Sequence, residues 1–147
     1  MNETYDTFGS MQIPLGWDGI CIEPNPSYHA GYKNRRCKLV GEVAGSPARN
    51  ISFVMAGSGG GVVGAQFKNK KAGKTSEVVT MCTVPLVDIL RKYNAPRVID
   101  YLSLDVEGAE STVLDATFPF DEYRFLTMTI EQPKRDLTAR LKAAGYH

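Results

Sequence analysis

The stretch "IDYLSLDVEGAESTVL", residues 99–114, decides the fold of this chain. It starts as an apolar strand and continues as a short helix after a turn at Gly108. A strand that leads directly into a helix is the building unit of an α/β sheet. Three carboxylates lie at the bend between the two elements: Asp105, Glu107 and Glu110. So many acids at the end of an apolar strand indicate a binding site.

The rest of the chain also alternates strands with helices. Apolar runs predict strands over 20–22, 37–45, 51–55, 77–84, 97–106 and 124–132. Helical periodicity predicts helices after Ser27 and over 85–93, 109–116 and 134–145. Thr83 is the expected N-cap of helix 85–93. This alternation predicts one α/β domain over residues 1–147, with helices on both faces of a sheet whose later half is mostly parallel.

The charge balance and hydropathy exclude several classes of protein. Seventeen basic and sixteen acidic residues leave a net charge of +1, which gives no argument for a nucleic-acid partner or an anionic membrane. The basic cluster 67–74 is short, and we interpret it as a solvated loop. No apolar run could span a bilayer, and the first 20 residues show no secretory signal. A cytoplasmic protein is therefore expected.

The numbers and positions of the cysteines and histidines limit the expected thiol oxidation state and the possible metal and catalytic sites. The three cysteines are widely spaced, and Cys21 and Cys37 lie in apolar runs where cysteine behaves as a small hydrophobic residue. This pattern predicts reduced thiols. His29 and His147 are the only histidines, which argues against a histidine-based metal site or a serine triad. We predict no metal ligands.

Carboxylates follow three of the predicted strands. Glu23 follows the apolar run 20–22, Asp105 follows the run 102–104 inside the predicted strand 97–106, and Glu131 follows 127–130 in the predicted strand 124–132. Ligands of open α/β sheets bind outside the carboxyl ends of the strands. Acids at this edge suit a ligand rich in hydroxyl and ammonium groups, such as one that carries a ribose diol. Each acid alone could equally cap the following turn; three at one edge favour the ligand.

The glycine-rich segment offers a rival interpretation. Gly59, Gly61 and Gly64 satisfy the dinucleotide pattern G-x-G-x-x-G after an apolar strand. A polar stretch follows instead of an apolar-periodic helix, and the sequence "AGKTS" at 72–76 lacks the first glycine of a phosphate loop. We therefore interpret 57–76 as a flexible loop that covers a site.

Several long stretches together resemble one known family. The stretches are "GWDGICIEPNPSYHAGYKNRRC", "IDYLSLDVEGAESTVL", "TMTIEQPK" and "LKAAGYH". From about Gly16 to His147 the chain is similar to the FkbM-type methyltransferases. The resemblance implies a Rossmann-like fold and S-adenosylmethionine as cofactor.

The resemblance also implies roles for individual residues. Glu23 and Pro24 would lie at the cofactor ribose, and Val43 and Ala44 would line the adenine. Asp105 and Val106 would also contact the cofactor. The implied catalytic residues are Asp105, Glu107 and Glu131, which would face the methyl donor and the acceptor.

Two departures from the family pattern affect the expected activity. We expect the chain to start after the family's first strand and glycine-rich turn, because "NETYDTF" could match the stretch just beyond that turn and no D-x-G-x-x-x-G precedes it. The chain also stops at "GYH", where the family continues. We therefore expect a trimmed domain. The predicted function is methyl transfer to a hydroxyl of a small molecule or sugar. The alternatives are a non-catalytic methyltransferase-like subunit for binding or assembly and, more weakly, a nucleotide-binding domain that uses the 57–64 loop.

Overall fold

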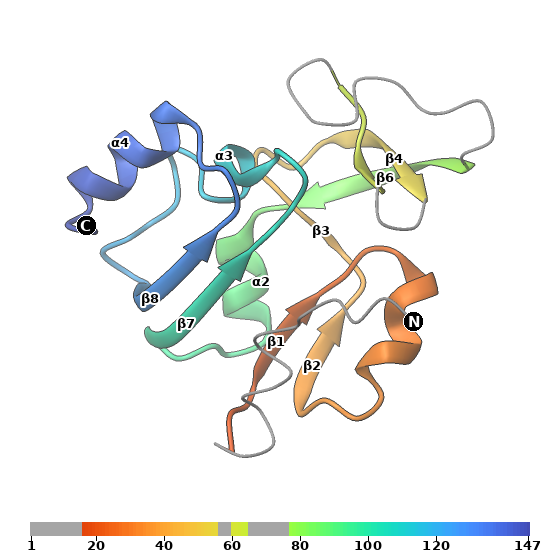
Figure 1. Cartoon of the computed structure of the whole chain (residues 1–147), viewed down its shortest axis with the longest axis horizontal. Helices are drawn as coiled ribbons and strands as arrows, with labels where there is room; N and C mark the ends of the chain where they lie inside the picture. The colour runs from red at the N-terminus through yellow and green to blue at the C-terminus, as the bar shows by residue number, and fades with distance from the viewer. Residues whose placement is uncertain (1–15, 56–59, 65–76) are drawn as a thin grey trace. The chain divides into compact units, whose positions relative to one another are not determined.

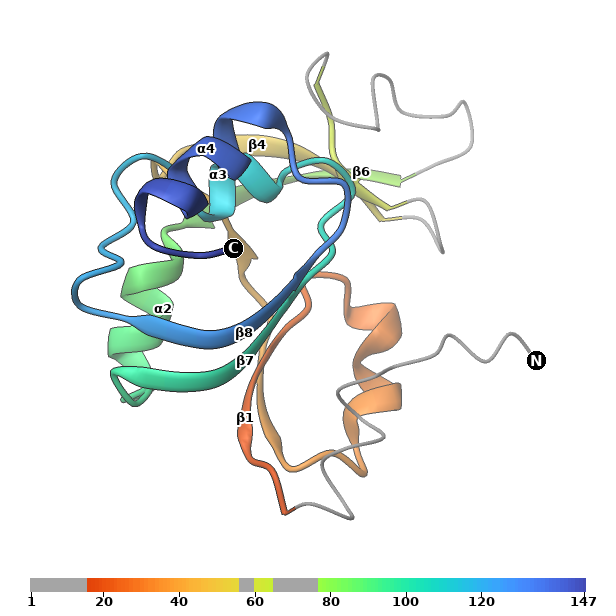
Figure 2. The same ribbon diagram turned by 60° about the vertical axis from the view of Figure 1, so that its left-hand side comes forward.

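The computed structural model describes residues 16–55, 60–64 and 77–147. Gly59, the basic cluster 67–74 and most of the predicted loop 57–76 lie outside the described residues. The chain divides into two compact units, Met1–Gly41 and Glu42–His147. Figures 1 and 2 show the elements of both units.

The first unit contains a pair of parallel strands. Strand β1 (Gly19–Ile22) pairs with β2 (Cys37–Val40), and the 3₁₀ helix η1 (Pro26–Tyr32) connects them. Asn25 begins η1, because its side chain accepts a hydrogen bond from the Ser27 backbone N–H at 3.0 Å. The predicted helix after Ser27 is therefore present, but as a short 3₁₀ turn.

A disulfide joins the two strands of this unit, so the prediction of reduced thiols is wrong for Cys21 and Cys37. Their Cα atoms lie 5.7 Å apart, within the range that a disulfide spans. Sixteen positions separate the two residues in sequence, and only the pairing of the strands shows that they are neighbours. Cys82 is an exposed free thiol. The expectation of a cytoplasmic protein therefore has no support from the cysteines.

The second unit begins with a mixed sheet. Its strand order is β3 (Val43–Ala44), β6 (Glu77–Val84), β4 (Asn50–Met55) and β5 (Gly61–Val62). Strands β3 and β6 are parallel, whereas β4 is antiparallel to both β6 and β5. Residues 61–62 thus continue a hairpin. The dinucleotide pattern requires a turn from strand to helix, which residues 60–64 do not form.

The second half of this unit is a parallel βα arrangement. Strands β7 (Val98–Leu104) and β8 (Arg124–Ile130) lie side by side with their carboxyl ends at the same edge (Figure 1). Helix α2 (Leu86–Lys92) precedes β7, α3 (Glu110–Val113) follows it, and α4 (Arg135–Ala143) follows β8. The most deeply buried apolar side chains in the core of this unit are Ile89, Leu114, Phe125 and Leu137.

The mixed α/β class is confirmed, but the strands differ from the predicted single sheet. The described residues form three separate sheets, of two, four and two strands. The predicted strand 37–45 is broken at Gly41 and Glu42, between β2 and β3. Thr83 does not cap α2, whose N-cap Pro85 has no side-chain hydrogen bond. Within the described ranges no helix is both long and apolar enough to cross a membrane.

Candidate functional site

The turn that follows β7 is shaped by a buried carboxylate. Glu107 and Gly108 both have positive φ, 54° and 93°, and this reverses the chain between β7 and α3. Glu110 is 1% exposed, and its Oε1 accepts hydrogen bonds from the backbone N–H of Gly108 at 3.0 Å and of Val106 at 3.4 Å. Glu110 therefore closes the turn from inside. The sequence places an acid there but does not show that it is the buried one.

Asp105 and Glu131 lie at one edge of the β7–β8 pair. Leu104 is opposite Ile130 in the parallel register, so the two acids follow the ends of neighbouring strands. The Glu131 N–H donates to the Leu104 carbonyl oxygen at 2.9 Å, which extends the pairing up to the acid. Asp105 is exposed and Glu131 is half-buried. The structure thus brings together two of the three predicted catalytic residues, and Glu107 stands two residues after Asp105 in the same turn.

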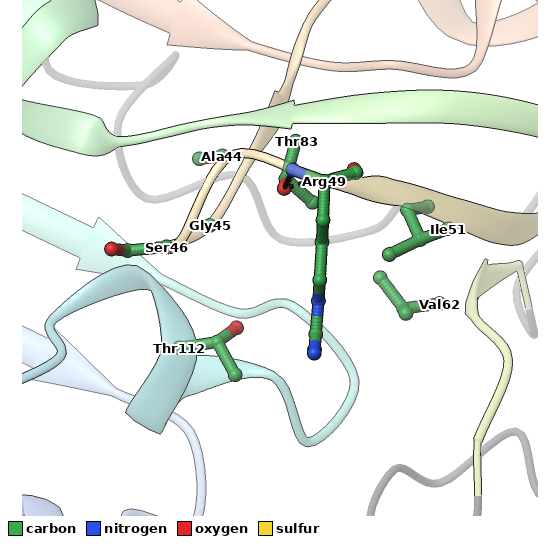
Figure 3. A pocket seen from close by; sticks show the side chains of 8 residues that line it. All are labelled: Ala44, Gly45, Ser46, Arg49, Ile51, Val62, Thr83 and Thr112. Atoms are coloured by element: carbon green, nitrogen blue, oxygen red, sulfur yellow. Dashed lines mark hydrogen bonds between the residues drawn. The ribbon is translucent and has the colours of Figure 1, made fainter.

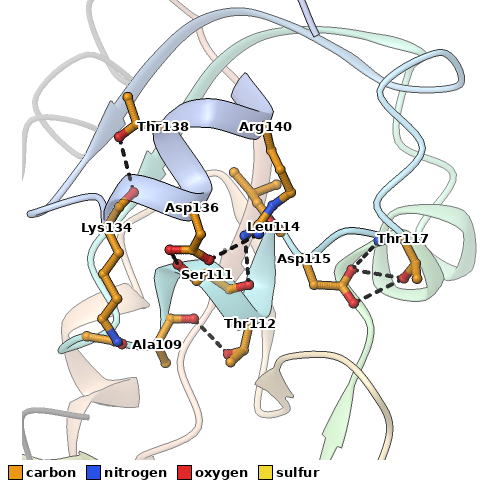
Figure 4. Close-up of polar contacts among 11 residues, drawn as sticks. Ala109, Ser111, Thr112, Leu114, Asp115, Thr117, Lys134, Asp136, Thr138 and Arg140 are labelled. Atoms are coloured by element: carbon orange, nitrogen blue, oxygen red, sulfur yellow. Dashed lines mark hydrogen bonds and ion pairs between the residues drawn. The ribbon is translucent and has the colours of Figure 1, made fainter. Parts of the chain in front are cut away.

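Side chains at and just before helix α4 donate hydrogen bonds to the turn and to α3 (Figure 4). Lys134, which immediately precedes the helix, donates from Nζ to the Gly108 carbonyl oxygen at 3.1 Å. Arg140 donates from Nη2 to the carbonyl oxygens of Ser111 and Leu114, at 3.2 and 3.1 Å. These bonds satisfy carbonyl groups of a helix too short to be stable alone. The position of the carboxylate turn, residues 105–109, therefore depends on α4.

A charged pair orients Arg140. Its Nη1 lies 3.0 Å from Asp136 Oδ2, one turn earlier on α4, and Asp136 Oδ1 accepts a hydrogen bond from the Ser111 hydroxyl at 3.2 Å. Partial desolvation raises the pKa of the exposed Asp136, but the hydrogen bonds from Arg140, the Leu137 backbone and Ser111 outweigh it and lower the pKa overall. Asp136 consequently stays ionised and keeps the guanidinium in place.

Glu23 stands at the carboxyl end of β1 in the first unit. Its Oε1 accepts a hydrogen bond from the Asn25 backbone N–H at 2.7 Å, and its carbonyl oxygen lies 2.8 Å from His29 Nε2. Burial raises the pKa of the Glu23 carboxyl, although the Asn25 bond and the charge of His29 oppose the shift. Pro24, the next residue, is half-buried. One carboxylate oxygen thus caps the turn, and Oε2 has no hydrogen-bond partner among the described residues.

The remaining predicted cofactor residues, Val43 and Ala44, form β3. Val43 is buried, whereas Ala44 is half-buried and lines a surface hollow (Figure 3). Thr83 holds the segment beside this hollow, because its hydroxyl donates to the Pro47 carbonyl oxygen at 2.8 Å and accepts from the Arg49 backbone N–H at 3.0 Å. This role replaces the predicted helix cap.

The sequence prediction assigns no individual role to two residues of the site region, Glu110 and Arg49. Glu110 carries a signal, since it lies two residues after the turn glycine, where a side chain can fold back onto the backbone. Arg49, which lines the hollow, carries none, because a single arginine in an irregular segment matches no motif. In the described segments, no group of three or more His, Cys, Asp or Glu side chains could hold a metal ion.

The predicted residues divide between the two units. Glu23 and Pro24 belong to the first, and Val43, Ala44, Asp105, Val106, Glu107 and Glu131 belong to the second. A family model described as the methyltransferase FkbM domain matches residues 2–146. The chain therefore belongs to the FkbM methyltransferase family. No curated protein and no solved structure matches the chain.

Proposed function

From this membership, we propose that the protein transfers a methyl group from S-adenosylmethionine to a hydroxyl oxygen of a small molecule or sugar. The observation that carries the proposal is the family match over residues 2–146, nearly the whole chain. The fold proposed with it is the Rossmann-like sheet of methyltransferases. The parallel β7–β8 pair, with acids directly after both strands, supports this fold.

The acids described above fit the chemistry of the cofactor. S-adenosylmethionine presents a ribose diol, an ammonium group and a sulfonium, and all of these favour negatively charged oxygen atoms. Glu23 is the proposed partner of the ribose, because Oε2 can accept a hydroxyl proton while Oε1 stays on the Asn25 N–H. That bond also fixes the carboxylate orientation before any ligand arrives, which lowers the entropic cost of binding. Pro24, Val43, Ala44 and Val106 would supply surrounding contacts.

The residues after β7 and β8 are proposed to act on the acceptor. When bound, S-adenosylmethionine supplies an electrophilic methyl group. Asp105 is exposed and follows the last residue of β7, so it is placed to take the proton from an acceptor hydroxyl. Glu107 and Glu131 would orient that hydroxyl. Because Glu110 and Lys134 hold the turn rigidly, these groups would need little rearrangement to reach a productive geometry.

Calorimetry with S-adenosylhomocysteine tests the cofactor assignment on the whole chain. A hydrogen bond to a charged group contributes about 1.5–3 kcal/mol, so Glu23→Ala should weaken binding by roughly ten- to a hundredfold. Asp18→Ala is the matched control, because Asp18 is an exposed acid just before the opposite end of the same strand. Equal affinities for the three proteins would refute the role of Glu23. If S-adenosylhomocysteine did not bind to the native chain, the assignment of S-adenosylmethionine as the cofactor would be refuted.

A second measurement tests the chemistry. Transfer of labelled methyl groups to a panel of sugars and hydroxy acids would identify an acceptor. Asp105→Asn should then lower turnover at least about a hundredfold, the lower end for losing an acid–base group, while cofactor affinity changes much less. Unchanged turnover in a folded variant would remove Asp105 from the catalytic set.

A further inference from the structure

A shallow hollow, open to solvent, lies beside β3 and α3 on the second unit. Its lining includes Ala44, Ser46, Arg49, Ile51, Val62 and Thr112. Its two sides are tied together, because the Ser46 backbone N–H donates to the Thr112 carbonyl oxygen at 2.8 Å. The hollow therefore belongs to the same framework as the carboxylate turn.

Arg49 is anchored at its backbone, and its side chain extends along the hollow. Its N–H donates to Thr83 Oγ1 at 3.0 Å, and its carbonyl oxygen accepts from the Thr83 N–H at 2.9 Å. Figure 3 shows the extended side chain with its guanidinium near Thr112 and Val62. This guanidinium makes no hydrogen bond or ion pair with the residues that the structure describes. Arg49 thus presents a cation from a fixed backbone, with no counter-charge bound to it in the described part of the chain.

The other lining groups define what such a cation could bind. A guanidinium offers five N–H donors in a planar fork that matches a carboxylate or phosphate. Ile51 and Val62 add an apolar surface next to it. The Thr112 hydroxyl donates to the Ala109 carbonyl oxygen at 2.7 Å, so its hydrogen is already used. Arg49 is consequently the one charged group among the residues that line the hollow.

We propose that this hollow binds the methyl acceptor through an oxyanion, either a carboxylate or a phosphate, that is attached to an apolar part of that molecule. Arg49 is the residue that recognises the oxyanion. The identity of the ligand as acceptor rests on the function proposed above; the anion site itself does not. Thr112 lies on α3, directly after the turn that carries Asp105 and Glu107, and Ala44 lies on the strand expected beside the cofactor. An acceptor bound at Arg49 would thus be held close to the carboxylate turn.

Nuclear magnetic resonance on the whole chain tests the anion site directly. The arginine Nε–H signals and the backbone amides would be followed during titration with acetate, butyrate and inorganic phosphate. We expect saturable shifts at Arg49, Thr112 and Val62. Arg135 is the internal control, because it is exposed and also lacks a hydrogen-bond or ion-pair partner among the described residues. Shifts at Arg135 as large as those at Arg49, or no saturation at Arg49, would overturn the proposal.

Variants separate the guanidinium from the apolar surface. Arg49→Gln should weaken binding of the best anion at least about tenfold, whereas Arg135→Gln should leave it unchanged. If the methylene groups of butyrate contact Val62, butyrate should bind at least about three times more tightly than acetate. Val62→Thr should abolish that preference. Tighter binding of phosphate than of butyrate would identify the anion as a phosphate. Equal binding by Arg49→Gln and the native chain would overturn the assignment.

The same samples distinguish this inference from the proposed function. S-adenosylhomocysteine would be titrated separately into the native chain and Arg49→Gln. Cofactor binding that survives in Arg49→Gln while anion binding is lost supports a distinct acceptor site. Anion binding without cofactor binding would refute the methyltransferase proposal and leave the anion site intact.

Discussion

Replacing Glu110 should destabilise the protein more than replacing any of its exposed acids. Oε1 of this buried side chain holds the Gly108 N–H at 3.0 Å and, over a longer distance of 3.4 Å, the Val106 N–H. One hydrogen bond to a charged acceptor contributes about 1.5–3 kcal/mol, and a buried donor left unsatisfied costs about 1–3 kcal/mol. Since these two figures partly describe the same loss, we expect Glu110→Ala to lower the free energy of unfolding by about 3 kcal/mol.

Glu110→Gln separates the acceptor from its charge. Glutamine keeps a carbonyl oxygen at the same position, so the loss should be only about 1 kcal/mol, the difference between a charged and a neutral hydrogen bond. Glu77→Ala is the control, because Glu77 is exposed at the start of β6 and should change stability by less than about 0.5 kcal/mol. The assay is urea denaturation followed by far-ultraviolet circular dichroism. If Glu110→Ala were as stable as Glu77→Ala, the buried acid would not be what holds the turn.

Three further predictions follow from particular residues. Glu107 has φ of 54°, which costs a non-glycine residue about 1–2 kcal/mol, so Glu107→Gly should raise the thermal midpoint despite the added chain entropy; a lower midpoint would argue against backbone strain there. Because burial raises the pKa of Glu23 above 4.5, the folded chain binds this proton more readily than the unfolded chain. The native chain should therefore gain stability relative to Glu23→Gln as the pH falls through that raised pKa, and cofactor affinity should weaken over the same window. The double variant Cys21→Ala/Cys37→Ala should lose about 3 kcal/mol of stability, the value for a closed loop of about this length, and dithiothreitol should destabilise the native chain but not the variant.

Strong periodicity located the elements of the second unit well. Strand β6 has the predicted bounds, and β8 begins at the predicted residue. The other ends of β7, β8 and α4 differ from their predictions by one or two residues. These elements have long apolar patterns, so local sequence determines them. The single predicted strand 37–45 became two, because an apolar run does not reveal where the chain leaves one sheet and joins another. The Cys21–Cys37 disulfide was missed for the same reason, since strand pairing is a long-range property.

The location of the candidate site residues was predictable where it depends on position in a strand. Asp105 and Glu131 were expected at one edge, and the parallel register of β7 and β8 places them there. Arg49 and Thr83 were not recognised, because their roles depend on contacts between segments more than 30 positions apart. Such contacts leave no local pattern in a single sequence.

The acids after β7 lie close together in sequence but differ in burial and in their contacts with the backbone. Glu110 is buried and bonded to the backbone, and Asp105 is exposed. Glu107 lies between them and carries the positive φ that the turn requires. Glycine adopts this conformation more readily than glutamate does, so the position carries a conformational cost that accords with the role proposed for the Glu107 carboxylate. Buried Glu110 and the Lys134 contact from the α4 side offset that cost, so the turn can present Glu107 and Asp105 in a fixed geometry.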